Sequence, residues 1–195
     1  MVVKLFQIET CPTEDFSLCV LSGAPKGTVT LNHRMSRGYP MGADYPSDAQ
    51  WAMCERYKGI KLSTLITCVS GILVLAKQAM EVLQDTGVTM ECLPFTLLNH
   101  KGRVASRDYF IVNLLGTLDC LDIEKSDIEW LDDQVGGEVI HVYDHVLDPR
   151  KIAGAPPVFR TKEDPYCIVL NETVAEKLRA PKPTNLYLTE LEVAT

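Results

Sequence analysis

A few side chains have the chemistry of catalytic groups, but their spacing matches no known catalytic pattern. Cys120 lies between Asp119 and Asp122. Neighbouring acids raise the pKa of a thiol and oppose formation of the nucleophilic thiolate, unless a base such as His100 approaches it. The chain also lacks a P-loop, a dinucleotide fingerprint, a G-x-S-x-G elbow and an H-E-x-x-H pair. We therefore expect no catalytic residue, and an enzyme that uses His100 or Cys120 stays an open alternative.

Two histidines, His141 and His145, have a spacing that would suit a metal ion on a helix. The surrounding pattern is typical of a strand, where Cβ atoms four residues apart are roughly 13 Å apart, too far for one ion. We therefore expect both histidines to face solvent. The sequence predicts no metal site and no cofactor.

The negative charge is concentrated in residues 119–138. This segment holds eight acids and one base, so its seven net negative charges equal the net charge of -7 of the whole chain. It also contains Trp130, and an acidic surface with an aromatic anchor suits a basic protein partner. The alternative is a solvated connection between strands, with Trp130 folded back onto the core. The candidate partner-binding residues here are Asp127, Glu129, Trp130, Asp132 and Asp133.

A second candidate surface is the segment 34–45, which mixes basic and aromatic residues. Glycines and prolines follow one another from residue 36 to residue 47 and predict a loop. The candidate partner-binding residues in this loop are Arg37, Tyr39 and Tyr45.

The composition excludes several classes of protein. With 46% hydrophobic and 23% charged residues, the chain of 195 residues is globular rather than disordered. An acidic net charge argues against nucleic-acid and anionic-membrane partners. Seven scattered cysteines without a C-x-x-C pair indicate free thiols in a reducing compartment. The sequence shows no signal peptide, so we expect a cytoplasmic protein.

The elements that must position these residues form two regions of one continuous domain. Residues 1–70 read as an N-terminal strand over 2–8, a loop, and a short helix through Trp51, Met53 and Cys54, capped by Ser47 or Asp48. Residues 71–195 read as an α+β core. Its predicted strands are 72–76, 88–98 with a break at Pro94, 109–115, 139–147, 166–170 and 185–193, its helices are 77–84 and 172–179, and a hairpin corner lies at 99–103.

The predicted core contains two stretches of similar sequence. Leu73–Leu75 and the helix after it match 168–170 and the helix after that at an offset of 95 residues. Both copies read as a strand, a short helix, a turn and a strand. Two related β-α-β lobes would explain this, and so would chance similarity between two ordinary β-α units.

An ordered set of short motifs resembles a known family. The motifs include Leu97–Arg103, Tyr109–Asn113, Asp119–Asp122 and Leu147–Lys151, and the likeness runs from about residue 39 to residue 195. The chain is similar to the bacterial immunity-protein family of polymorphic toxin systems whose founding member is an uncharacterised myxobacterial protein. The resemblance implies a non-enzymatic protein that binds the toxin made beside it and blocks that toxin. It carries over no catalytic residues and does not locate the binding face.

We therefore expect an α+β protein with an antiparallel or mixed β-sheet and short helices. Its expected function is a cytoplasmic immunity protein that neutralises a cognate, cytoplasm-acting toxin by stoichiometric occlusion. A small-ligand-binding or scaffold module is the alternative. The sequence leaves the oligomeric state and the chemistry of the toxin open.

Overall fold

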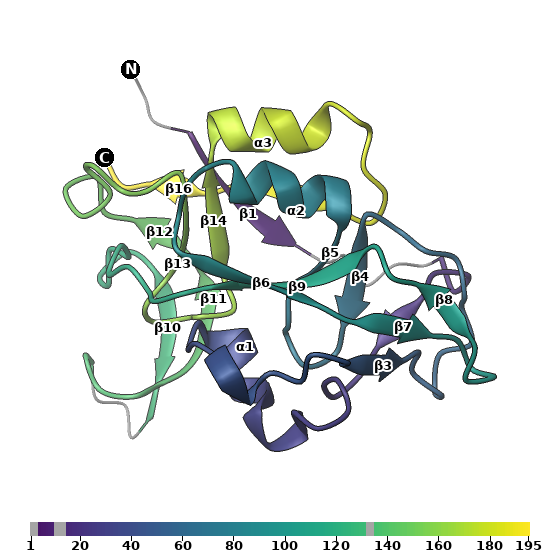
Figure 1. The fold of residues 1–195 in the computed structure, drawn as a ribbon. Helices are drawn as coiled ribbons and strands as arrows, with labels where there is room; N and C mark the ends of the chain where they lie inside the picture. The colour runs from purple at the N-terminus through teal and green to yellow at the C-terminus, as the bar shows by residue number, and fades with distance from the viewer. Residues whose placement is uncertain (1–3, 10–14, 132–134) are drawn as a thin grey trace.

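The computed structural model describes residues 4–9, 15–131 and 135–195. It has the expected α+β fold, with short helices and several small antiparallel and mixed sheets (Figure 1). The helices are α1 (Asn32–Arg37), α2 (Lys77–Gln84) and α3 (Glu172–Arg179), with 3-10 turns at Val29–Leu31 and Gly42–Asp44. The strands are β1 (Leu5–Glu9), β2 (Val20–Leu21), β3 (Gln50–Ala52), β4 (Leu65–Cys68), β5 (Val74–Ala76), β6 (Met90–Pro94), β7 (Thr96–Leu98), β8 (Val104–Ser106), β9 (Tyr109–Leu114), β10 (Asp127–Trp130), β11 (Val139–Asp144), β12 (Val146–Leu147), β13 (Val158–Arg160), β14 (Ile168–Asn171), β15 (Tyr187–Glu190) and β16 (Glu192–Val193).

The two larger sheets share one topology. One has the order β2-β4-β5-β9-β6 and the other has the order β13-β14-β1-β15. In each, an antiparallel strand pair (β4 and β5, or β13 and β14) leads into an eight-residue helix and then into an edge strand (β6 or β15). A further strand lies between the strand before the helix and the edge strand after it, and it pairs antiparallel with both. This strand is β9, between β5 and β6, in the first sheet and β1, between β14 and β15, in the second. This shared topology supports the interpretation of two related lobes, with β1 taking the place of β9.

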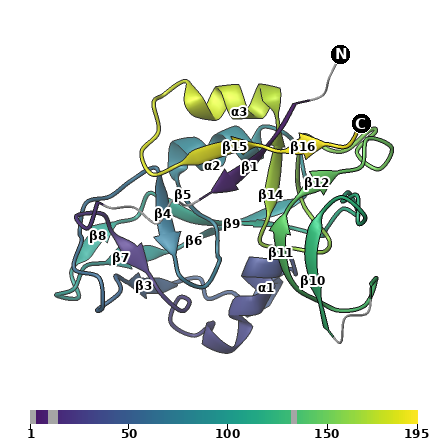
Figure 2. The same ribbon diagram turned by 180° about the vertical axis from the view of Figure 1, so that it is seen from behind.

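The two sheets share a central core, to which helices α2 and α3 contribute their apolar faces. Alternate residues of a strand point to opposite faces, so Leu75 and Leu170 join this core while Val74 and Val169 point to separate clusters. Helices α2 and α3 pack side by side in both views of the fold (Figures 1 and 2). The strand predicted over 109–115 is β9, which lies between β5 and β6 and is buried on both faces.

Local signals in the sequence predict both core helices to the residue. The side chain of Asn171 accepts a hydrogen bond from the N–H of Val174 at 3.0 Å and caps α3. Apolar residues at helical spacing bury one face of α2, and Gly87 just after it has a φ of +74°. The corner at 99–103 is also confirmed, since Gly102 has a φ of +69° and the N–H of Asn99 donates to the carbonyl of Arg103.

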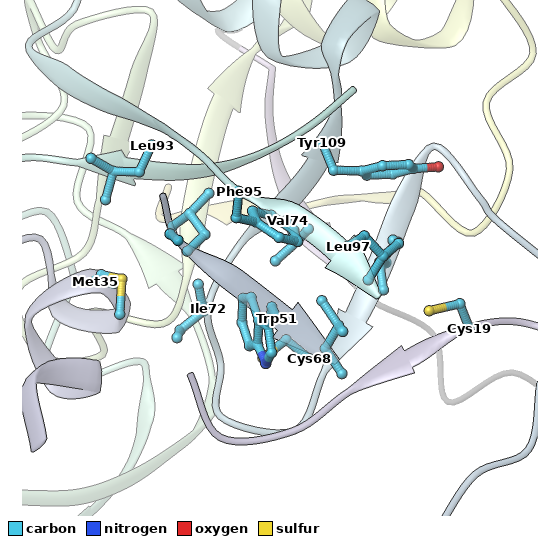
Figure 3. Packing of buried hydrophobic residues seen from close by; sticks show 14 of the residues in the cluster. Cys19, Met35, Trp51, Cys68, Ile72, Val74, Leu93, Phe95, Leu97 and Tyr109 are labelled. Atoms are coloured by element: carbon cyan, nitrogen blue, oxygen red, sulfur yellow. The ribbon is translucent and has the colours of Figure 1, made fainter. Parts of the chain in front are cut away.

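The helix predicted through Trp51, Met53 and Cys54 is wrong. Gln50–Ala52 is strand β3, which pairs in parallel with β7. Trp51 is 3% exposed, its ring meets Phe95 edge-on at a centroid distance of 5.4 Å, and its Nε1 donates to the carbonyl of Ser22 (Figure 3). Burial of this aromatic side chain between neighbours remote in sequence overrides the local helix signal.

Candidate functional site

The acidic segment contributes strand β10, which pairs with β11 just after the segment; this β10–β11 hairpin pairs with no other strand in the part of the chain that the structure describes. It lies at the side of the molecule away from β3, β7 and β8 (Figures 1 and 2). Trp130 opposes Val139 and Ile128 opposes Val142, and these apolar pairs form the inner face. The polar pairs form the outer face: Asp127 with Asp144, and Glu129 with His141.

Two irregularities in the ladder expose apolar side chains. The register shifts leave Ile140 and Tyr143 on β11 without an opposing residue on β10. Bulges re-aim side chains, and these two are 55% and 63% exposed. The sequence pattern alone missed both residues, because a regular alternation hides a bulge.

The polar groups of the outer face contact mainly one another. The hydroxyl of Tyr143 donates to the Glu129 carboxylate at 2.7 Å, which raises the pKa of Tyr143. The rings of His141 and Tyr143 meet edge-on at 4.6 Å. Asp127 and Asp144 lie directly opposite each other, an arrangement of like charges that disfavours the folded hairpin.

A cleft of about 590 Å³ separates the hairpin from residues 162–166, and it brings together two of the predicted residues, Arg37 and Trp130. The guanidinium of Arg37 lies over the ring of Tyr166, 6.0 Å from its centroid. That ring fills the space beside Gly71, where a Cβ would come within 2.5 Å of the Tyr166 ring.

The far end of the cleft holds an ion-pair group. Lys151 Nζ lies 2.7 Å from the carboxylate of Asp119 and donates to the carbonyl of Leu121, and Lys162 Nζ lies 4.0 Å from the same carboxylate. Glu163 beside them is partly buried, and burial raises the pKa of its carboxyl group. Its Oε2 has no hydrogen-bond partner among the described residues.

The other predicted residues do not join this cleft. Tyr45 is partly buried against the hydrophobic cluster that contains Trp51 and Phe95, and its hydroxyl donates to the carbonyl of Pro94 at 2.9 Å. Tyr39 is 57% exposed, and its carbonyl accepts from the Asn113 side chain. Asp127 and Glu129 lie on the outer face of the hairpin, as described above. Asp132 and Asp133 lie outside the described residues.

Two charged residues that the sequence analysis missed, the half-buried Glu91 and the buried Arg160, hold the loop and the end of α1 before it in place. The carboxylate of Glu91 accepts from the N–H groups of Met41 and Gly42 at 2.8 Å each. Arg160 is 1% exposed, and burial lowers its pKa to about 10. Its guanidinium donates to four backbone carbonyls, those of Met35, Ser36, Leu114 and Pro165.

The thiol considered for catalysis is buried, and the ring nitrogens of His100 have no hydrogen-bond partner among the described residues. Cys120 is fully buried, and desolvation raises its pKa to about 12, which opposes thiolate formation. The expectation that His145 faces solvent is wrong: it is 9% exposed, and its Nε2 lies 3.1 Å from the Asp164 carboxylate, because β11 ends before it and turns its ring inward. His141 is exposed as expected.

Within the ranges 4–9, 15–131 and 135–195, no group of three or more His, Cys, Asp or Glu residues is arranged to hold a metal ion. No helix in the same ranges has the length and apolar composition needed to cross a bilayer. The cysteines that the structure describes are free thiols.

Comparison with known proteins places the chain in a family. A search of proteins with curated descriptions gives no match. A family model described as "Immunity protein family (Imm11)" matches residues 25–193, which is most of the chain. The match confirms the resemblance to an immunity-protein family seen in the sequence. The chain therefore belongs to the immunity protein family Imm11.

Proposed function

We propose that this immunity protein acts in the cytoplasm, where it binds one cognate toxin and blocks it stoichiometrically, with the β10–β11 hairpin as the main contact surface. Membership of an immunity family supports toxin binding in general. The observation that carries the choice of surface is the hairpin itself: acids lie beside the exposed Tyr143 on its outer face, and Ile140, exposed at the second bulge, lies at the edge of the cleft.

The chemistry of this face suits a basic groove on the toxin. Asp127, Glu129 and Asp144 supply a local negative potential that steers a positive surface into contact. Ile140 and Tyr143 supply apolar area that a partner can bury, and such anchors dominate interface energetics. Toxins that bind nucleic acids or nucleotides through a basic substrate groove are the class of partner that this face fits, and covering the groove would block substrate access.

The test uses the toxin domain encoded beside this gene, as purified protein. The paired reversal Asp127→Lys with Glu129→Lys is expected to weaken toxin binding by at least ~100-fold, because two attractive charge contacts become repulsive. For the wild-type protein, affinity should fall as salt rises. Calorimetry and rescue of cells that express the toxin measure the two effects.

The matched control reverses two charges on the core helices. Glu81→Lys on α2 with Glu176→Lys on α3 changes net charge by the same amount, and both are exposed residues outside the cleft and the hairpin. This variant should retain toxin affinity. Equal losses in both variants would contradict a specific role for the hairpin and leave only a general effect of net charge.

A further inference from the structure

We propose that the cleft beside the hairpin receives an arginine side chain of the toxin, stacked on the indole of Trp130 and held by the carboxylates of Glu138 and Glu163. This inference rests on the proposed function and names the chemistry of the partner at the same site. It makes the hairpin one wall of a pocket as well as an outward surface.

The cations of the cleft are already engaged within the chain. Lys151 and Lys162 share the carboxylate of Asp119. Arg37 lies over Tyr166. An anionic ligand would have to compete with these partners. The described lining holds four acids (Asp119, Glu138, Glu163 and Asp164) against three bases, so the net charge of the cleft favours a cation.

The acids of the cleft are not all engaged. Asp119 pairs with the two lysines, and Asp164 accepts from the N–H of Tyr166 and lies beside His145. Glu163 has a carboxylate oxygen that is buried and unpartnered among the described residues. The backbone N–H of Glu163 and the charges of Lys151 and Lys162 favour the carboxylate, but the buried Oε2 has no donor of its own in the described part of the chain, and a buried acceptor without a donor costs free energy. The terminal torsion of a glutamate is soft, so this oxygen can turn towards a donor that enters the cleft.

Trp130 supplies the apolar part of the pocket. It lines the cleft, and no ring or cation contact involves its indole in the part of the chain that the structure describes. A guanidinium stacks on an aromatic face and donates in a planar fork to carboxylates, whereas an ammonium is a compact, strongly hydrated point charge. Arg37 already lies over Tyr166 at the cleft, 6.0 Å from the ring centroid, at the outer limit of a cation–π contact. The pocket therefore selects arginine over lysine.

A peptide experiment tests the pocket without the toxin. The probes are acetyl-Gly-Arg-Gly-amide, the same peptide with neutral citrulline, the same peptide with lysine, and inorganic phosphate. Binding is read from Trp130 fluorescence, since the other tryptophan, Trp51, is buried, and Trp130→Phe should remove the signal. The arginine peptide should bind the full-length protein at least about tenfold more tightly than either analogue. Phosphate binding without arginine binding would overturn the proposal.

Glu163→Gln is the decisive variant, with Glu81→Gln as its matched control. Loss of a charge-assisted hydrogen bond should weaken peptide binding about tenfold in the first variant only. Because burial raises the pKa of Glu163, its charged form costs stability at pH 7, so Glu163→Gln should melt at the same temperature or higher. A large drop in melting temperature would mark Glu163 as a structural residue and contradict the proposal.

The toxin arm separates this inference from the proposed function. If the toxin binds wild-type protein and Glu163→Gln with equal affinity, the arginine pocket is wrong while the hairpin surface stands. If the arginine peptide binds but the adjacent toxin does not, the proposed function is wrong while the pocket stands.

Discussion

The loop over residues 37–45 and the hairpin β10–β11 both present charged and aromatic residues, yet the fold uses them differently. In the loop, Tyr45 donates to a carbonyl of the core, and Glu91 accepts the N–H groups of Met41 and Gly42. In the hairpin, Glu129 and Tyr143 bond to each other. In the loop, charged and aromatic side chains therefore stabilise the fold, because they bond to backbone groups. In the hairpin only the inner face is buried, so the same residue types on the outer face are exposed.

The largest expected effect comes from removing the side chain that anchors the end of α1, the helix that leads into the loop. Arg160→Met removes the donor to four buried carbonyls, which should destabilise the fold by more than ~3 kcal/mol. Urea denaturation measures the loss. Arg160→Lys should recover only part of it, since an ammonium has fewer donors in a different geometry. Full stability of the methionine variant would show that the hydrogen bonds of Arg160 do not hold α1 against the core.

The next effect removes the second anchor. Glu91→Gln keeps the shape but loses charge and one acceptor atom, and should cost about 2 kcal/mol. Hydrogen exchange should then speed up at the N–H groups of Met41 and Gly42. Unchanged protection there would mean that the loop keeps its shape without the carboxylate.

A matched pair of substitutions sharpens the comparison directly. Tyr45→Phe breaks a partly buried hydrogen bond and should cost about 1 kcal/mol, whereas Tyr143→Phe breaks an exposed one and should change stability by less than ~0.5 kcal/mol. Thermal unfolding of both variants, side by side, gives the difference. Equal losses would remove the distinction drawn between the two regions.

The smallest expected effect has the opposite sign. Asp127→Asn relieves the repulsion from Asp144 across the ladder and should stabilise the protein by a few tenths of a kcal/mol, while it weakens toxin binding. Chemical denaturation and calorimetry on the same sample compare the two quantities. A stability loss would indicate that the acid supports the fold.

Sequence patterns predicted the features whose causes are local. Helix α3 follows from its cap at Asn171, and the acidic surface follows from charges that are visible in the chain. The misses have distant causes. Strand β3 forms because Trp51 pairs with Leu97 of β7. Arg160 is buried because it donates to carbonyls of residues remote in sequence, such as Met35. Ile140 and Tyr143 escaped prediction because the register of a two-stranded ladder depends on the partner strand.

The position of β1 has a consequence for synthesis of the protein. Leu5–Glu9 is synthesised long before its hydrogen-bonding partners β14 and β15, which lie more than 150 residues later in the chain. At ~5–20 residues per second, this strand waits on the order of 10–30 s for them. Partners so far apart also slow folding. We therefore expect that a chain truncated before β14 leaves β1 without its partners and cannot complete this sheet.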